Sequence, residues 1–231
     1  MKSLIYFVLT FVFLLISCQK ESQITDRVDI RINGFKKGTV FLNKLENGLP
    51  EPVDSIKVKG TDSISFDLSA FEPQLMLITI EDIPNRYILF FSDDTINKIY
   101  TSLAKFGLEK FLSGGDNLKK WQYYQEMVQT YNDRKLDLMK EEFDASQNKD
   151  TARLTEVREK MTSLDKRIKR FALNFVFENK NLPVSAYAAL VEFHNNPQIL
   201  DTVYKSFPQN IKQSLYAQEI KKILDSVQRS E

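Results

Sequence analysis

The stretch Phe111–Trp121, FLSGGDNLKKW, marks a change in the pattern of the chain. Before it, apolar and polar residues alternate in short runs; after it, glycine disappears and apolar residues recur every three or four positions. A period of two is typical of half-buried strands, and a period near 3.6 is typical of amphipathic helices. Asp116 or Asn117 can cap the first helical turn. The sequence therefore predicts an α+β protein, with a β domain over 27–112 and a helical domain over 116–231.

Upstream of this point, about seven or eight short runs are rich in β-branched and aromatic residues. Examples are residues 28–32, 54–58 and 63–68, and turn residues such as Asn33-Gly34 and Asn47-Gly48 separate such runs. Alternating runs with a turn every 8 to 12 residues or so are typical of two-layered or closed β architectures. We therefore expect an all-β sandwich or an open barrel.

Downstream, the spacing predicts a helix from Asp116 to about Ser146, a turn at 147–150 and a second long helix. Apolar residues in the second helix alternate at spacings of three and four, as in a coiled-coil seam: Leu154, Val157, Met161, Leu164, Ile168, Phe171 and Phe175. The first helix offers Leu118, Trp121, Tyr124, Val128, Tyr131 and Leu138, then Met139 and Phe143 on a drifted face. The short turn predicts an antiparallel hairpin of these two helices.

Such a hairpin brings the acidic region of Glu126 and Asp133 opposite the basic cluster 166–170, so we expect ion pairs between them. Pro183 ends the second long helix, because proline is tolerated only in the first helical turn. Shorter helices are predicted over 184–193, 197–207 and 210–228. The hairpin seam and the β domain are expected to form two separate cores.

The first eighteen residues have the pattern of a targeting segment. Lys2 is followed by a long apolar run that is too short for a bilayer core of about 20 residues, and the run ends in Leu15-Ile16-Ser17-Cys18. Branched aliphatic residues, a small residue and a cysteine resemble a lipobox. We therefore predict a lipoprotein signal peptide over 1–17, lipidation of Cys18 and a tether over 18–26. An uncleaved anchor and an ordinary signal peptide are the alternatives.

Lipidation would place the chain in the cell envelope and would remove its only thiol. Several acyl chains such as palmitate hold a protein stably on a membrane. We therefore expect the membrane to be a partner of this protein, through the lipid on Cys18. The outer membrane is favoured over the inner because no Asp follows Cys18, and the face of the membrane stays open. Lys2 is the only charged residue removed, which leaves a neutral mature chain and no electrostatic reason to expect a nucleic acid.

Three groups of titratable residues could carry chemistry, and each group has a simpler interpretation. Asp93-Asp94 could bind a cation or share a proton, but we expect a solvated turn. Glu141, Glu142 and Asp144 lie near a helix end and are expected to be surface charge. His194 precedes Asn195-Asn196-Pro197 and is expected to end a helix, because no second histidine exists to complete a metal site.

Two further groups could form binding surfaces. The cluster 166–170 could contact nucleic acid or lipid headgroups, and the intramolecular ion pairs described above are the favoured alternative. Trp121, Tyr123, Tyr124 and Tyr131 could stack on a sugar or peptide, but three of them follow the seam spacing and only Tyr123 is expected to be exposed. No nucleophile elbow or phosphate-binding glycine loop occurs in the sequence. We therefore predict no catalytic, cofactor-binding or metal-binding residue.

Two stretches resemble a known family. Gly38–Leu45, Asn47-Gly48, Val53–Val58 and Ser65-Phe66 resemble the uncharacterised N-terminal β domain of Bacteroidota thiol-disulfide oxidoreductase lipoproteins, and Asn179 with 183–187 matches a recurring Pro-Val-Ser-Ala-Tyr stretch of their helical segment. The resemblance implies a lipobox, a β domain and a helical segment. The Trp-Cys-x-x-Cys domain of that family does not occur in this sequence, so its redox chemistry is not implied here.

These observations favour a cell-envelope lipoprotein that acts as a non-enzymatic binding or scaffolding module for an unidentified envelope protein or polymer. The alternative is an accessory protein that serves a thiol-disulfide oxidoreductase or a peroxide-handling system in trans. A third hypothesis, an enzyme that uses carboxylates, would need two carboxyl groups facing each other about 5 to 10 Å apart in a cleft.

Overall fold

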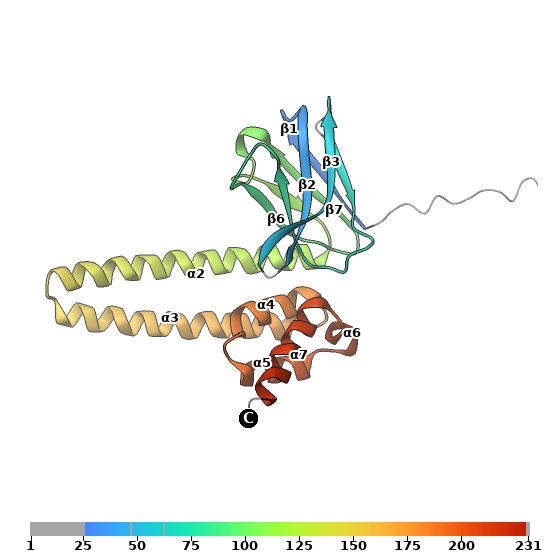
Figure 1. Ribbon diagram of the computed structural model, residues 1–231. Helices are drawn as coiled ribbons and strands as arrows, with labels where there is room; N and C mark the ends of the chain where they lie inside the picture. Colours follow the sequence, from blue (N-terminus) through green and yellow to red (C-terminus); the bar gives the residue numbers. More distant parts are fainter. Residues whose placement is uncertain (1–25, 47, 62, 230–231) are drawn as a thin grey trace, which may run out of the picture.

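The computed structural model describes residues 26–46, 48–61 and 63–229 and confirms the α+β class. A β-sandwich forms the N-terminal part, and helices form the remainder (Figure 1). The prediction for Cys18 and the segment 1–25 lies outside the described residues. None of the helices in these residues combines the length and apolar character needed to cross a bilayer.

The sandwich consists of two four-stranded sheets. One sheet has the order β4-β1-β7-β8, with β4 (Ser63–Asp67), β1 (Arg27–Asn33), β7 (Ile96–Ser102) and β8 (Phe111–Ser113). The other has the order β3-β2-β5-β6, with β3 (Leu49–Lys59), β2 (Lys37–Glu46), β5 (Leu75–Ile80) and β6 (Tyr87–Phe91). In the first sheet β1 and β7 run parallel, and the other pairs are antiparallel. We expected a sandwich or an open barrel, and two separate sheets correspond to the sandwich.

Alternation of side chains explains why these segments pair as they do. In β1, Val28, Ile30 and Ile32 point into the sandwich, and Asp29 and Arg31 point out of it. β4 repeats the pattern with Ile64 and Phe66 inside. Because a slip by one residue would expose all of these apolar side chains, the buried face fixes the register. A short 3-10 helix, η1 (Leu103–Lys105), interrupts the chain between β7 and β8.

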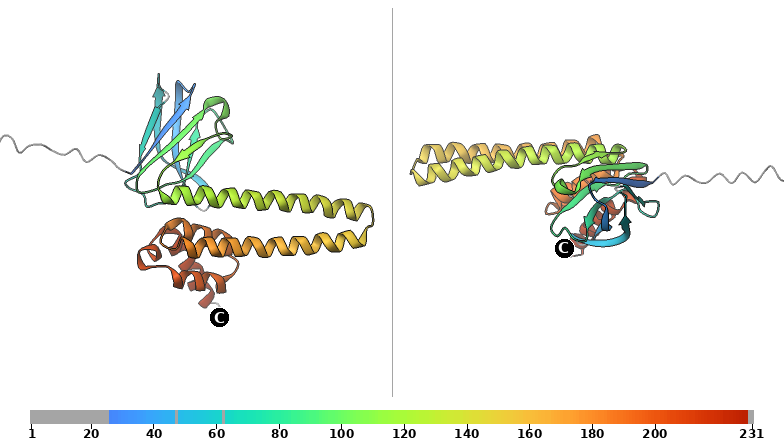
Figure 2. Two further views of the ribbon diagram at one scale, coloured as in Figure 1. Left: turned by 180° about the vertical axis from the view of Figure 1, so that it is seen from behind. Right: turned by 90° about the horizontal axis from the view of Figure 1, so that it is seen from above.

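The helical part begins with two long antiparallel helices, α2 (Asp116–Gln147) and α3 (Thr151–Glu178), joined by the short turn that the sequence predicts. The side chain of Asp150 caps α3 by accepting a hydrogen bond from the backbone N–H of Arg153 at 2.9 Å. The helices α4 (Pro183–Phe193), α5 (Pro197–Ser206), α6 (Gln209–Lys212) and α7 (Leu215–Gln228) follow. Figures 1 and 2 show that the distal half of the hairpin projects beyond the sandwich and beyond these helices.

One helical prediction was wrong: the helix expected over 210–228 is divided into α6 and α7. Ser214 adopts an extended backbone conformation and directs its hydroxyl to the carbonyl of Ile211 at 2.7 Å. The backbone N–H of Leu215 then donates to the carboxylate of Glu72 at 2.9 Å, so a side chain from the sandwich starts the new helix.

The hairpin seam follows the predicted pattern, with Met139 and Phe143 off the seam as expected. Val157, Leu164 and Phe175 of α3 are buried, as are Leu118, Trp121, Tyr124 and Leu138 of α2. Met139 and Phe143 instead lie on the outer face of α2, with 51% and 62% of their surface exposed. Leu138 and Ala145, seven residues apart, are both buried, so the 3,4 repeat continues along α2 and Met139 and Phe143 lie off it, facing away from α3.

The buried residues do not form the two cores that we expected. One continuous cluster joins the interior of the sandwich to the base of the hairpin and to α4, α5 and α7. The rings of Phe91, Tyr187 and Tyr216 meet at this junction, with centroids 5.1 to 6.0 Å apart. A second, smaller cluster lies in the distal hairpin and is built on Leu138, Val157 and Leu164. The domain limits at 112 and 116 remain a prediction.

The continuous core predicts that sandwich and helices unfold together. Phe91→Ala should lower the free energy of unfolding by about 3–5 kcal/mol, because it removes a fully buried ring. Circular dichroism at 215 nm and the fluorescence of Trp121, the single tryptophan, should then show the same reduced midpoint in urea. A Trp121 transition that stays at the wild-type midpoint would show that the helices form a separate unit.

Candidate functional site

Asp93 lies where the sandwich meets the helices and fixes the start of α2. Its Oδ2 accepts a hydrogen bond from the backbone N–H of Leu118 at 3.2 Å, and its Oδ1 accepts one from Nδ2 of Asn117 at 3.2 Å. A carboxylate at a helix N-terminus satisfies a free N–H group and interacts favourably with the helix dipole. A Cβ at Gly115 would lie 2.5 Å from Oδ2 of Asp93, which explains why glycine precedes this helix.

Two other helices start in the same way at this junction. The Oδ1 of Asn117 accepts a hydrogen bond from the backbone N–H of Val184 at 3.1 Å, next to the first residue of α4. Glu72, from the loop before β5, receives the N–H of Leu215 at the start of α7. The hydroxyl of Tyr216 in turn accepts the N–H of Leu75 at 2.8 Å. Three helices are therefore tied to the sandwich, or to each other, through their first N–H groups.

The Asp93-Asp94 pair is thus more than the solvated turn that we expected. Much of Asp94 is exposed to solvent, and the rest of it is buried. This partial burial, together with the nearby carboxylates of Asp26 and Asp93, raises the pKa of Asp94 above its usual value. Asp94 lines a shallow depression with Glu72, Asp93 and Asp116. Because Glu72 and Asp93 already accept helix N–H groups, this depression has the character of a capping site rather than of a pair of free catalytic carboxylates.

The other acidic candidates belong to the hairpin. Glu141 pairs with Arg153 at 2.6 Å, and Glu142 pairs with Arg158 at 2.9 Å, both across the two helices. Asp144 is exposed. Among the described residues, no three His, Cys, Asp or Glu side chains come together in a way that could hold a metal ion.

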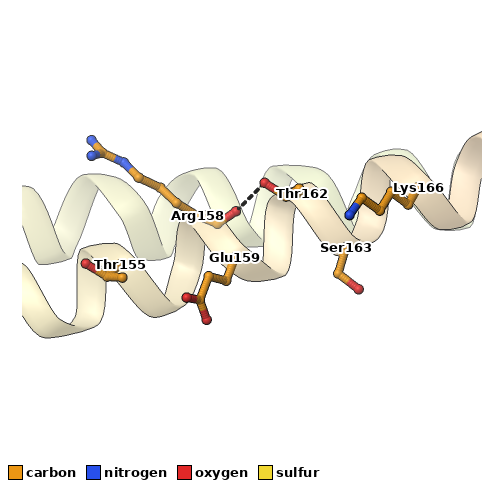
Figure 3. Close-up of a pocket in the computed structure, with 6 residues that line it drawn as sticks. All are labelled: Thr155, Arg158, Glu159, Thr162, Ser163 and Lys166. Carbon is orange, nitrogen blue, oxygen red and sulfur yellow. Dashed lines mark hydrogen bonds between the residues drawn. The ribbon is translucent and has the colours of Figure 1, made fainter.

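The expected pairing of the basic cluster was wrong. None of the ion pairs that the structure contains in its described part includes Lys166, Arg167, Lys169 or Arg170, and the hairpin pairs Lys135 with Asp165 instead, at 3.5 Å. Lys166 and Arg170 lie on the solvent side of α3, too far around the helix to reach α2. Figure 3 shows part of this face.

The residues in Figure 3 do not form an enclosed site. Thr155, Arg158, Glu159, Thr162, Ser163 and Lys166 all come from α3, and their side chains point outward from this one helix. The single hydrogen bond among them joins the Thr162 hydroxyl to the backbone carbonyl of Arg158 at 3.0 Å. This is the ordinary solvated face of a helix.

The remaining candidates occupy structural positions. His194 directly follows α4, is exposed, and places Nδ1 3.1 Å from the carbonyl of Val191. Trp121 and Tyr124 are buried in the continuous core, and Tyr131 packs against the distal cluster. Tyr123 is half exposed, as we expected, and its ring meets that of Phe171 edge-on at 6.1 Å.

The outer face of the sheet β4-β1-β7-β8 carries a surface that the sequence analysis missed. The strand register places Ser63, Arg31, Tyr100 and Phe111 in one row across the four strands. The next row contains Ser65, Asp29, Lys98 and Ser113. Tyr100 and Phe111 are 44% and 63% exposed, and their ring centroids are 6.0 Å apart. We call these two rows the sheet platform.

A shallow depression lies beside the aromatic pair of the sheet platform. Asp29, Arg31, Ser63, Ser65 and Tyr100 contribute side chains to it. The Ser65 hydroxyl donates to Oδ1 of Asp29 at 2.8 Å, and Nε of Arg27 donates to the same carboxylate at 3.1 Å. The depression therefore combines an aromatic edge with hydroxyl, carboxylate and guanidinium groups on a rigid sheet.

Comparison with known proteins adds no assignment. No family model, curated protein or solved structure matches the chain. The resemblance to the Bacteroidota oxidoreductase lipoproteins stays a prediction.

The capping role of Asp93 predicts a loss of stability on its removal. Asp93→Ala should lower the free energy of unfolding by about 1–2 kcal/mol, because it leaves the backbone N–H of Leu118 and the side-chain amide of Asn117 without their acceptor. Asp144→Ala removes an exposed carboxylate elsewhere on the same helix and should change stability by less than about 0.5 kcal/mol. Urea unfolding of both variants makes the comparison. Equal effects would contradict the capping role.

The raised pKa of Asp94 predicts a pH-dependent gain from Asp94→Asn. The folded protein holds the Asp94 proton more tightly than the unfolded chain, whose Asp pKa is about 3.9. The contribution of Asp94 to stability is therefore present below that pH and is lost as the pH rises through the folded pKa. Asp94→Asn should stabilise the protein at pH 7 and give no gain near pH 3. A gain of the same size at both pH values in urea unfolding would show that proton binding is not the cause.

Proposed function

We propose that the chain is a cell-envelope lipoprotein, anchored through Cys18, that acts as a non-enzymatic binding or scaffolding module for an envelope protein or polymer. The observation that carries this proposal is the exposed Tyr100–Phe111 pair, which continues in one row to Arg31 and Ser63. The sheet platform is the contact surface.

The chemistry of the sheet platform supports a binding role. Two large apolar rings on the outside of a sheet are unfavourable in water, and groups of this kind mark sites of interaction. Aromatic and arginine side chains contribute most of the binding energy at many interfaces. The depression on this face is shallow, so the face suits an extended chain or a protein surface better than a small molecule that must be enclosed.

The N-terminal sequence supports the proposed location in the cell envelope. The pattern Leu15-Ile16-Ser17-Cys18 ends an apolar run of signal-peptide length. A tether over 18–26 spans at most about 30 Å, so lipidation would hold the sandwich close to the membrane. The accessory role in a thiol-disulfide or peroxide system rests on the sequence resemblance, and no contact in the molecule favours it over a general binding role.

The test is crosslinking in cells with the lipidated full chain, followed by mass spectrometry. Tyr100→Ser and Phe111→Ser should each reduce the crosslinked partner by about tenfold or more, since truncating a central interface aromatic often costs about 2 kcal/mol. Thermal stability should stay nearly unchanged, because both side chains are exposed.

Tyr87→Ser is the matched control, because Tyr87 is an equally exposed tyrosine on β6 of the other sheet. It should leave the crosslinks intact. Crosslinks that persist in the Tyr100 and Phe111 variants would show that the sheet platform is not the contact surface. A thioredoxin-fold partner among the lost crosslinks would replace the general role with the accessory role.

A further inference from the structure

A stripe of apolar side chains runs along the outer face of α2 near the tip of the hairpin. Leu136, Met139 and Phe143 are 52%, 51% and 62% exposed. Their spacings of three and four place them on one side of the helix. Leu138 and Ala145 of the same helix segment are buried on the side that faces α3. The three exposed residues therefore face away from α3. We call these three residues the tip stripe.

The tip stripe lies on the part of the molecule that projects furthest. Figures 1 and 2 show α2 and α3 extending together past the sandwich and past α4–α7, so neither covers this face. A solvated helix face normally carries polar side chains, whereas three large apolar residues in line are typical of a helix that packs against another.

We infer that the tip stripe pairs with the tip stripe of a second copy of this chain, with the two α2 helices antiparallel. In heptad terms, Leu136 and Phe143 occupy a positions, and Met139 occupies a d position. Antiparallel seams place a residues opposite d residues, so Leu136 of each copy packs against Met139 of the other. Phe143 then packs against Asn132 of the second copy at both ends of the seam.

The charges beside the tip stripe support this arrangement. In the register that joins Leu136 to Met139, Asp133 comes opposite Lys140 of the second copy on one flank. Lys135 comes opposite Glu142 of the second copy on the other flank. Each contact occurs twice because the pair is symmetric. Lys135 and Glu142 already contact Asp165 and Arg158 of α3, so the second flank extends existing ion pairs.

The same charges disfavour the competing arrangements. The neighbouring antiparallel register, which joins Phe143 to Met139, places Lys140 opposite Lys140 and Glu142 opposite Glu142. A parallel pair places Lys135 opposite Lys140 of the second copy, again with like charges. Like charges in contact are unfavourable. Of the three arrangements compared, the flanking charges therefore favour the antiparallel pair that joins Leu136 to Met139.

The seam covers only about three helical turns, so the pairing is expected to be weak and to depend on concentration. Two molecules anchored in one membrane would meet at a high effective concentration. The inference does not depend on what the sheet platform binds, because the tip stripe lies on the opposite part of the molecule, at the end of the hairpin.

Cysteine crosslinking tests the contact directly. The chain has one cysteine, so Cys18→Ser leaves an introduced cysteine as the only thiol. In the full chain, Met139→Cys should give covalent dimers with a short bis-maleimide at least tenfold faster than Thr162→Cys, which places an exposed cysteine on the solvent side of α3. Equal rates at both positions would overturn the inference.

Charge exchange tests the register. Asp133→Lys and Lys140→Asp should each weaken the dimer by about tenfold in sedimentation velocity, since each places two pairs of like charges in contact. The double variant should restore the wild-type affinity. Seven residues separate the two positions, about 10 Å along one helix, so they cannot compensate for each other within a copy. A monomer at all concentrations, or a double variant that stays weak, would refute the proposed pair.

Discussion

The backbone N–H groups at the start of a helix have no partner within the helix, and in this protein three such starts lie at one junction. A buried helix end without acceptors would cost several times the net energy of one hydrogen bond. Asp93, Asn117 and Glu72 supply these acceptors. Because two of them come from loops of the sandwich, the β-sheets determine where the helices begin and in which direction they leave.

This arrangement makes the sandwich and most of the helices one unit. The caps hold α2 and α7 against the sandwich and α4 against α2, and the rings of Phe91, Tyr187 and Tyr216 pack together at the junction. The distal hairpin differs, because its own cluster has three buried residues and its ion pairs are solvent exposed. Exposed ion pairs contribute little stability. The molecule is therefore a rigid body that presents a sheet face and a less strongly held arm.

Local patterns in the sequence predict the elements well, and they predict contacts between distant residues poorly. The period of two gives the strands, and the 3,4 spacing from Leu154 to Phe175 gives the hairpin. The alternation around Ile99 also indicates that Tyr100 faces outward, but only the register with β8 brings it to Phe111. Likewise, no local signal shows that Glu72, in a loop of the sandwich, accepts the first N–H of a helix that begins 143 residues further along the chain. The ion pairs of the basic cluster 166–170 were predicted wrongly, because the rotation of α3 about its own axis decides which of its charges face α2.

Hydrogen–deuterium exchange of the full chain tests whether the sandwich and the helices share one core, because it reports the stability of each segment in one experiment. If sandwich and helices share one core, β1, β5, α4 and α7 exchange with the same free energy, through global unfolding only. Amides near residues 136–160, at the end of the hairpin, should exchange earlier. Strands that open independently of α4 and α7 would contradict a shared core and the capping junction on which it depends.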